Sequence, residues 1–309
     1  MYLYIEVIEM KLTTKEQLLF LALHQFSYRE SWSYLKYLKD HELMNQPLEL
    51  KECQEIIEDL KVQQLLRVQT TVNFLNYQSF KNVIDTLEEQ SISIVDHDYP
   101  RQWLYIHQPP LIVFYKGHKE LLNKPLVSVI GSRTLSPYGQ KMAHLISSQL
   151  VQHQNVIVSG LANGVDTIAH EAASQYKDQS TIAILPNGLN QCYPKNNAPL
   201  QKRIETYHLA LSEYLPHICA RKHQFVMRNR LVAGLAPIVV VIEAAKKSGS
   251  LITANYALQF NKELFVLPGE ITNPMARGTN ELIKAGATPI TQIDKLVTEV
   301  TALQNLWKN

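Results

Sequence analysis

The chain has 309 residues, 46% of them hydrophobic, which is enough for two domains with ordinary buried cores. It contains no stretch of 18 apolar residues, so the sequence excludes a membrane-spanning helix. The three cysteines are scattered without a paired spacing, and no basic segment leads the apolar start at residues 1–10. We therefore expect unpaired thiols, no signal peptide and a cytoplasmic location.

The net charge of +2 hides an asymmetry along the chain. Residues 1–95 carry 9 Lys and Arg against 14 Asp and Glu, a balance of −5, whereas the remaining residues have a balance of +7. A polyanionic partner is therefore expected at the second part of the chain and not at the first.

Residues 11–90 are predicted to be helical. Apolar residues recur at helical spacing around Leu18, Leu35 and Ile56, and Thr13 or Thr14 followed by Glu16 resembles a capping box. This part of the chain has no glycine. We predict a small helical domain over residues 1–95, and its acidic balance favours an interaction or spacer role over DNA binding.

A joint follows this domain. Residues 91–95 are strand-like, and the apolar run after the prolines at 109 and 110 is strand-like as well. A sheet domain is then predicted over residues 96–290. The tail, residues 291–309, has the apolar spacing of one terminal helix.

Within the sheet domain, glycines punctuate a series of apolar runs. All eleven glycines of the chain lie after residue 116. The runs, each followed by a glycine-bearing loop, are residues 126–130, 156–158, 181–185, 238–242 and 264–267. Strand, glycine loop and helix in repetition predict a mostly parallel α/β sheet whose loops gather at the carboxyl ends of the strands. Such loops present backbone N–H groups that suit phosphate.

The first two loops carry candidate phosphate contacts. The first is Gly131-Ser132-Arg133, where the arginine offers a planar fork to a phosphate, or else caps or pairs locally. The second begins Ser159-Gly160, and its second glycine allows a nest of N–H donors. Asp166 in that loop is interpreted as a helix N-cap in preference to a catalytic group.

The segment from residue 221 to 230 is the most informative. It holds Lys222, Phe225, Arg228 and Arg230, and no acid occurs between Glu213 and Glu243. Cations interleaved with an aromatic side chain are typical of single-strand recognition, in which the charges follow the backbone and the ring stacks on a base. The alternative is a solvated helix start whose Phe225 belongs to the core.

A further loop, Lys247-Ser248-Gly249-Ser250, opens a helix and forms a candidate anion site. Glu243, at the end of the preceding strand, is either a general base or a partner that orients Arg230 or another arginine, and we favour the second role. Lys195, in the loop after the third run, either reaches phosphate or is solvated.

No catalytic constellation is evident. The sequence has no phosphate-binding loop of the GxxxxGK[ST] type, no GxGxxG and no close metal-ligand group. Loops that offer phosphate donors and arginines without a nucleophile predict binding in place of turnover. We therefore expect a protein that is not an enzyme and that uses no cofactor or metal.

These motifs together resemble the DNA-processing protein A (DprA/Smf) family. The resemblance covers about residues 95–290, and the motifs that carry it, in order, are 127–133, 159–166, Phe225 with 228–230, 247–250, and 267–269 with 278–280. It implies an extended Rossmann-like domain that binds single-stranded DNA, protects incoming DNA during natural transformation and loads the recombinase RecA. It also implies a homodimer formed through the sheet domain.

Carried onto this sequence, the resemblance implies a DNA pocket of Arg133, Lys222 and Phe225. The other residues that it places at or near the pocket are Gly131, Ser132, Ser159, Gly160, Arg228, Arg230, Lys247, Ser248, Gly249 and Ser250. A SAM-like helical domain is expected before the sheet domain. This sequence departs from the family in having Val226 where a proline is common and in lacking the length for a winged-helix domain.

A second reading is an enzyme. Lysine-decarboxylase-like phosphoribohydrolases of nucleoside monophosphates share a related sheet and a PGGxGTxxE motif. Here Pro268-Gly269-Glu270 is separated from Gly278-Thr279-Asn280-Glu281 by an insertion, and the acid falls one position early. The spacing therefore disfavours this alternative.

Overall fold

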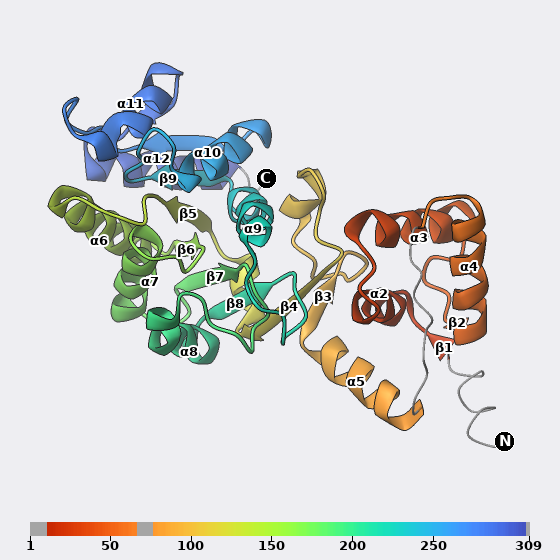
Figure 1. Cartoon of the computed structure of the whole chain (residues 1–309). Helices are drawn as coiled ribbons and strands as arrows, with labels where there is room; N and C mark the ends of the chain where they lie inside the picture. The colour runs from red at the N-terminus through yellow and green to blue at the C-terminus, as the bar shows by residue number, and fades with distance from the viewer. Residues whose placement is uncertain (1–10, 67–76, 307–309) are drawn as a thin grey trace. The chain divides into compact units, whose positions relative to one another are not determined.

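The computed structural model describes residues 11–66 and 77–306, so the predictions for residues 1–10, 67–76 and 307–309 lie outside it. The chain divides into two compact units (Figure 1). The first comprises Met1–Tyr99 with Pro110–Phe114, and the second comprises Pro100–Pro109 with Tyr115–Asn309. Among the described residues, none of the helices combines the length and the apolar character needed to cross a membrane.

The first unit is mainly helical. Its helices are α2 (Thr14–Leu23), α3 (Tyr28–Asp40), α4 (Leu50–Val62) and α5 (Tyr77–Glu89). Its short strands are β1 (Lys11–Leu12) and β2 (Leu48–Glu49), which pair antiparallel, and β3 (Ser91–Ser93), which pairs antiparallel with the start of β4 (Ile112–Gly117). The β1–β2 pair is a difference from the purely helical expectation. It joins Leu12 to Leu48, which are both buried.

Side-chain caps explain where the first helices begin. The Thr13 side chain accepts a hydrogen bond from the backbone N–H of Glu16, and the Glu16 carboxylate accepts one from Thr13 at 2.7 Å. Ser27 and Glu30 repeat the arrangement at the start of α3. The capping box predicted from the sequence at Thr13 is thus present, and each box satisfies two N–H groups that a helix end leaves open.

The second unit is built on a parallel sheet. Its strands are β5 (Leu126–Ile130), β6 (Val156–Ser159), β7 (Thr181–Leu185), β8 (Leu209–Ser212), β9 (Ile238–Val241), β10 (Glu263–Val266) and β11 (Thr288–Pro289). Their order is β11-β10-β9-β5-β6-β7-β8, and every neighbouring pair in it is parallel. The mostly parallel Rossmann-like sheet is therefore confirmed. The strand order reverses between β5 and β9, the place where sheets of this kind leave a crevice for a ligand.

Helices cover both faces of this sheet (Figure 1). Val127 and Val129 of β5 point into a core shared with α6, α7 and α12, whereas the hydroxyl of Ser128 donates to the carbonyl of Val232 in α9 at 2.7 Å. The alternation of side chains along a strand thus assigns α6 and α9 to opposite faces. The helices are α6 (Pro137–Gln152), α7 (Val165–Tyr176), α8 (Ala198–Tyr207), α9 (Lys222–Leu235), α10 (Gly249–Gln259), α11 (Arg277–Lys284) and α12 (Ile293–Leu306).

Short 3₁₀ turns complete the second unit: η1 (Arg101–Tyr105), η2 (Lys119–Asn123), η3 (Lys195–Asn197) and η4 (Pro274–Ala276). The predicted terminal helix corresponds to α12, and its Leu296 and Val300 are part of the sheet core. The assignment of residues 291–309 to a separate tail and the SAM-like arrangement of the first unit stay predictions.

Candidate nucleic-acid interface

A cavity of about 750 Å³ lies where the strand order reverses. The loops after β5, β6 and β9 contribute to its wall, and so do α9 and the start of α10. The predicted site residues that line it are Gly131, Ser132, Arg133, Gly160, Lys222, Phe225, Arg228, Lys247, Ser248, Gly249 and Ser250. The fold therefore gathers segments that are more than a hundred residues apart in sequence.

Arg133 and Phe225 meet across this cavity. The guanidinium carbon of Arg133 lies 5.3 Å from the centre of the Phe225 ring, a cation–π arrangement. Lys222 begins α9 one turn before Phe225, so both side chains fall on one side of the helix. Arg133 and Lys222 are exposed, and neither forms an ion pair within the described part of the chain. The three residues named first from the sequence thus lie at one cavity.

The loop of Arg133 is held by Glu243. The backbone N–H of Ser132 donates to the carbonyl of Glu243 at 2.7 Å. The buried carboxylate of Glu243 accepts hydrogen bonds from the hydroxyl and the backbone N–H of Ser136, at 2.5 and 3.0 Å. The expectation that Glu243 orients Arg230 or another arginine is wrong, because its carboxylate oxygens accept hydrogen bonds from Ser136 at the start of α6. Glu243 instead fixes the loop that carries Arg133.

The start of α10 forms the opposite rim. The Ser248 hydroxyl caps the helix by accepting from the N–H of Ser250 at 3.3 Å, and the two hydroxyls share a hydrogen bond of 2.7 Å. Lys247 is exposed beside them and has no acidic partner among the described residues. A helix N-terminus with an adjacent cation favours an anionic ligand.

Arg228 lies at the floor of the cavity and is 4% exposed. Its Nη1 donates to the carbonyls of Gly160 and Ile184, so it ties the ends of β6 and β7 together. A Cβ at position 160 would overlap the guanidinium, and this explains why a glycine is needed there. Burial lowers the pKa of Arg228 to about 10, so its charge persists at neutral pH.

Asp166 is a buried acid whose charge interacts with that of Arg228. It lies in the first turn of α7, whose N-cap is Gly164, and accepts a hydrogen bond from the N–H of Ala162 at 3.2 Å. The prediction that Asp166 is the helix N-cap is wrong, because Gly164 holds that position and Asp166 is the second residue of α7. Burial raises the pKa of this carboxyl, and the Arg228 charge opposes that rise.

Two predicted DNA contacts do not line the cavity. Arg230 is 1% exposed, and its Nη2 binds both carboxylate oxygens of Glu213 at 2.6 and 2.7 Å. Ser159 is fully buried and donates to the carbonyl of Val129. Their polar atoms serve the fold, so we leave both residues out of the site. Charge along the sequence could not reveal this, because the acid that neutralises Arg230 precedes it by 17 residues.

Sequence reasoning missed an aromatic residue of the cavity wall. Tyr193, in the loop after β7, lines the cavity and packs edge-to-face against Phe225 with ring centres 5.1 Å apart. A tyrosine next to a proline carried no signal by itself. The spacing between residues 193 and 225 gave no sign that the two rings meet.

The family model described as DNA recombination-mediator protein A matches residues 90–301 of this chain. DNA processing protein DprA of Streptococcus pneumoniae is 42% identical over 209 residues, which cover 68% of this chain and 73% of the relative. The chain belongs to the DprA/Smf family. DprA of Bacillus subtilis is 34% identical over 228 residues, covering 72% of this chain and 76% of its own.

Solved structures of DprA proteins have the same fold. The crystal structure of DprA from Streptococcus pneumoniae covers 94% of this chain and 99% of its own, with a TM-score of 0.77 and 33% identity. A structure of DNA processing protein A from Helicobacter pylori, which concerns its single-stranded DNA binding mode, covers 69% and 96%, with a TM-score of 0.64 and 34% identity.

In this DprA/Smf chain, side-chain hydrogen bonds connect the two parts of the motif on which the phosphoribohydrolase alternative depends. The amide of Asn280 clasps the backbone of Gly269, donating to its carbonyl at 3.0 Å and accepting from its N–H at 3.2 Å. Glu270 accepts a hydrogen bond from Thr272, and neither Glu270 nor Glu281 lines the cavity. The phosphoribohydrolase reading is therefore not favoured.

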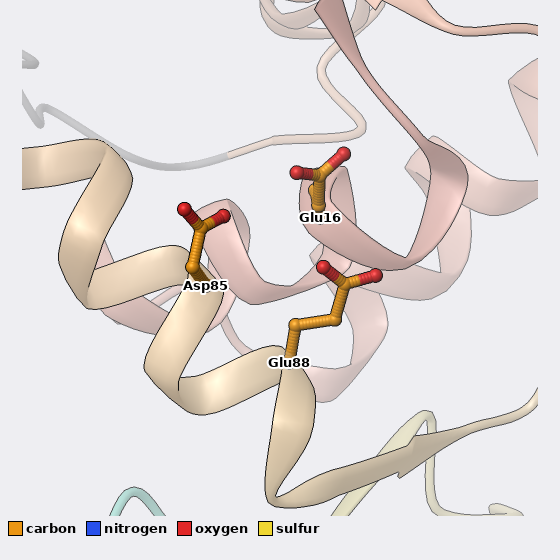
Figure 2. A group of neighbouring side chains, drawn as sticks. All are labelled: Glu16, Asp85 and Glu88. Carbon is orange, nitrogen blue, oxygen red and sulfur yellow. The ribbon is translucent and has the colours of Figure 1, made fainter.

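One acidic cluster lies in the first unit. Glu16 of α2 and Asp85 and Glu88 of α5 bring carboxylate oxygens within 4.8 Å of one another (Figure 2). Sequence spacing gave no sign of it, because the two helices are far apart in the chain. Lys81 already occupies a central position, with its Nζ 2.6 Å from Glu16 and 2.7 Å from Asp85. Lys81 thus pairs with two of the three carboxylates of the cluster.

Proposed function

We propose that this protein binds single-stranded DNA in the cavity at the β5–β9 switch point, without breaking covalent bonds. The observation that carries the proposal is the convergence of Arg133, Lys222 and Phe225 on one cavity. The two cations would take consecutive phosphates, and the ring would stack on a base. The related Helicobacter pylori protein, studied for its single-stranded DNA binding mode, supports this ligand.

The remaining parts of the wall have defined roles in the proposal. Lys247 and the backbone N–H of Gly249 supply a second phosphate position at the start of α10. Arg228 supplies a fixed positive charge beneath the strand, since its Nη1 is anchored on two carbonyls. Gly131 and Gly160 leave the room that Val165 and the Arg228 guanidinium occupy beneath the cavity loops.

Family membership carries the rest of the proposal. We propose that the protein protects incoming DNA during natural transformation, acts in the cytoplasm and loads RecA onto the strand. We also propose a homodimer formed through the sheet domain. Sedimentation velocity tests the dimer, and a strand-exchange assay with RecA on strands coated by single-strand-binding protein tests the loading. A monomer, or an unchanged exchange rate, would remove the corresponding claim.

The central test replaces both exposed cations, in the double variant Arg133→Ala with Lys222→Ala. Fluorescence anisotropy with an oligo-dT probe should show affinity at least about tenfold weaker, because two charge-assisted phosphate contacts are lost. The slope of log K against log salt should fall by about 1.4, at roughly 0.7 for each phosphate of a single strand.

The matched control is Lys202→Ala with Lys284→Ala, which removes the same charge from exposed positions outside the cavity. It should leave the affinity and the salt slope close to those of the wild type. Equal losses in the two double variants would mean that bulk charge, and not this cavity, binds the strand. Equal affinity for double-stranded probes would contradict the proposed single-strand preference.

A further inference from the structure

Tyr193 is a part of the cavity wall that the proposed function does not use. Its side chain is 45% exposed although it lines the cavity, and its hydroxyl has no hydrogen bond within the described part of the chain. Exposed aromatic rings at a cavity that carries unpaired cations are suited to stacking on nucleobases. The ring is therefore available for a stacking contact with a base.

The two aromatic rings of the cavity form a corner. The planes of Tyr193 and Phe225 are inclined at 73°, with ring centres 5.1 Å apart. A flat group that lies against one ring of such a pair meets the other ring at its side. Arg133 approaches the same Phe225 ring with its guanidinium. The cavity therefore offers two apolar walls next to a phosphate-binding cation, which matches the parts of one nucleotide.

The loop that carries Tyr193 is held from both sides. The side-chain amide of Asn187 donates to the carbonyl of Gln191 at 2.9 Å, and that of Gln201 donates to the same carbonyl at 3.0 Å. Backbone N–H groups of Gly188 and Asn190 donate to the carbonyls of Ile218 and Pro216. A ring on a fixed loop loses little conformational entropy when a ligand stacks on it.

We propose that Tyr193 contacts the nucleobase held at Phe225 and forms the second wall of the base site. The inference rests on the proposed function, because it names a further contact in the same single-strand site. It adds a base-contacting residue from the loop after β7, which the sequence gave no reason to choose.

The test compares Tyr193→Ala, Tyr193→Phe and the wild type by anisotropy with two probes of equal length, oligo-dT and a fully abasic strand. Tyr193→Ala should weaken binding of oligo-dT by about fivefold or more, in line with the measured value of one base–aromatic stack. Binding of the abasic strand should stay unchanged, since its phosphate contacts remain. Tyr193→Phe should bind both probes like the wild type.

A double variant separates direct contact from an effect through Phe225. If Tyr193 contacts the base, Tyr193→Ala should still weaken oligo-dT binding in a Phe225→Ala background. If the second substitution has no effect there, Tyr193 acts through Phe225 alone and the inference is overturned. Tyr207→Ala, at an equally exposed tyrosine outside the cavity, is the matched control and should change nothing.

The outcomes for the two proposals are distinct. Wild-type protein that fails to bind oligo-dT would overturn the proposed function itself. Wild-type binding with equal affinity of Tyr193→Ala for oligo-dT would overturn the role of Tyr193 and leave the proposed function standing. Equal losses on the abasic strand and on oligo-dT would also overturn it, because the residue would then not contact a base.

Discussion

The ion pairs of the first unit contrast with the cations that border the cavity of the second unit. In the first unit, Lys81 is bound between Glu16 and Asp85, and Lys15 lies 3.0 Å from Asp96. In the second, Arg133, Lys222 and Lys247 border a cavity without an acidic partner among the described residues. Cations that stabilise a fold are paired with acids, whereas cations that serve a ligand are left unpaired.

The same contrast exists within the second unit. Arg230 and Arg133 were both candidates for DNA binding, but Arg230 is buried against Glu213 and Arg133 is exposed above Phe225. Substitution of Arg230 should therefore change stability, and substitution of Arg133 should change DNA binding. Three measurements test this division between paired and unpaired cations, beginning with the largest expected effect.

Arg230→Met should destabilise the protein by about 3–5 kcal/mol, because it leaves the buried Glu213 carboxylate without its partner. Urea unfolding followed by circular dichroism measures this loss. Arg133→Met should change stability by less than about 0.5 kcal/mol, as is usual for an exposed side chain. Its affinity for oligo-dT should fall, while that of folded Arg230→Met should not.

A second variant separates a loss of DNA binding from a loss of folding. The double substitution Arg230→Met with Glu213→Leu removes both charges and should recover most of the stability. It should bind oligo-dT like the wild type. A well-folded double variant with weak binding would return Arg230 to the DNA site and break the division between paired and unpaired cations.

Acid should weaken the sheet unit through two buried histidines. His170 and His208 are fully buried, and burial lowers their pKa values to about 3 and about 4. Between an ordinary value near 6.5 and these values the unfolded chain binds more protons, so stability falls as pH falls. The slope should reach about 1.4 kcal/mol per pH unit for each histidine.

Hydrogen exchange of the β6 and β7 amides at pH 8, 6 and 5 localises this effect to the sheet unit. His170→Asn should flatten the dependence on pH, since one of the two titrating groups is gone. His217→Asn, at an exposed histidine, is the control and should keep the wild-type slope. A flat profile in the wild type would contradict the assignment of acid sensitivity to the buried histidines.

The smallest effect is expected at Lys81. Lys81→Met removes the cation from between Glu16 and Asp85 and should reduce stability by about 1 kcal/mol at pH 7. Lys61→Met, in an exposed pair with Glu58, should have less effect, and neither variant should change DNA affinity.

Much of the sheet could be predicted from sequence, because apolar runs that end at glycine mark buried parallel strands. The run at residues 126–130 corresponds to β5 and that at 181–185 to β7, without a shift. The strand β8 was not predicted. It ends at Ser212 and is followed by Glu213 and Tyr214 with no glycine, so the signal on which the prediction relied is missing there.

The site was predictable where charge or motif marked a residue, and not where contacts between distant parts of the chain decide its role. Arg133, Lys222 and Phe225 stood out through charge and motif, and they line one cavity. The prediction for Arg230 failed because the pairing of a residue in α9 with an acid that directly follows β8 is invisible in a charge count. Tyr193 and the Glu16 cluster escaped because each depends on contacts between residues tens of positions apart.

The guanidinium above Phe225 has a consequence for how a strand leaves the site. Because Arg133 already lies against the ring, an arriving base must take the place of that contact or share the ring with it. The nucleotide at this ring is then gained by exchange, and the contact between Arg133 and Phe225 is restored when that nucleotide departs. For a protein proposed to transfer a strand, a contact that re-forms in this way permits the strand to leave in steps and not in one slow dissociation.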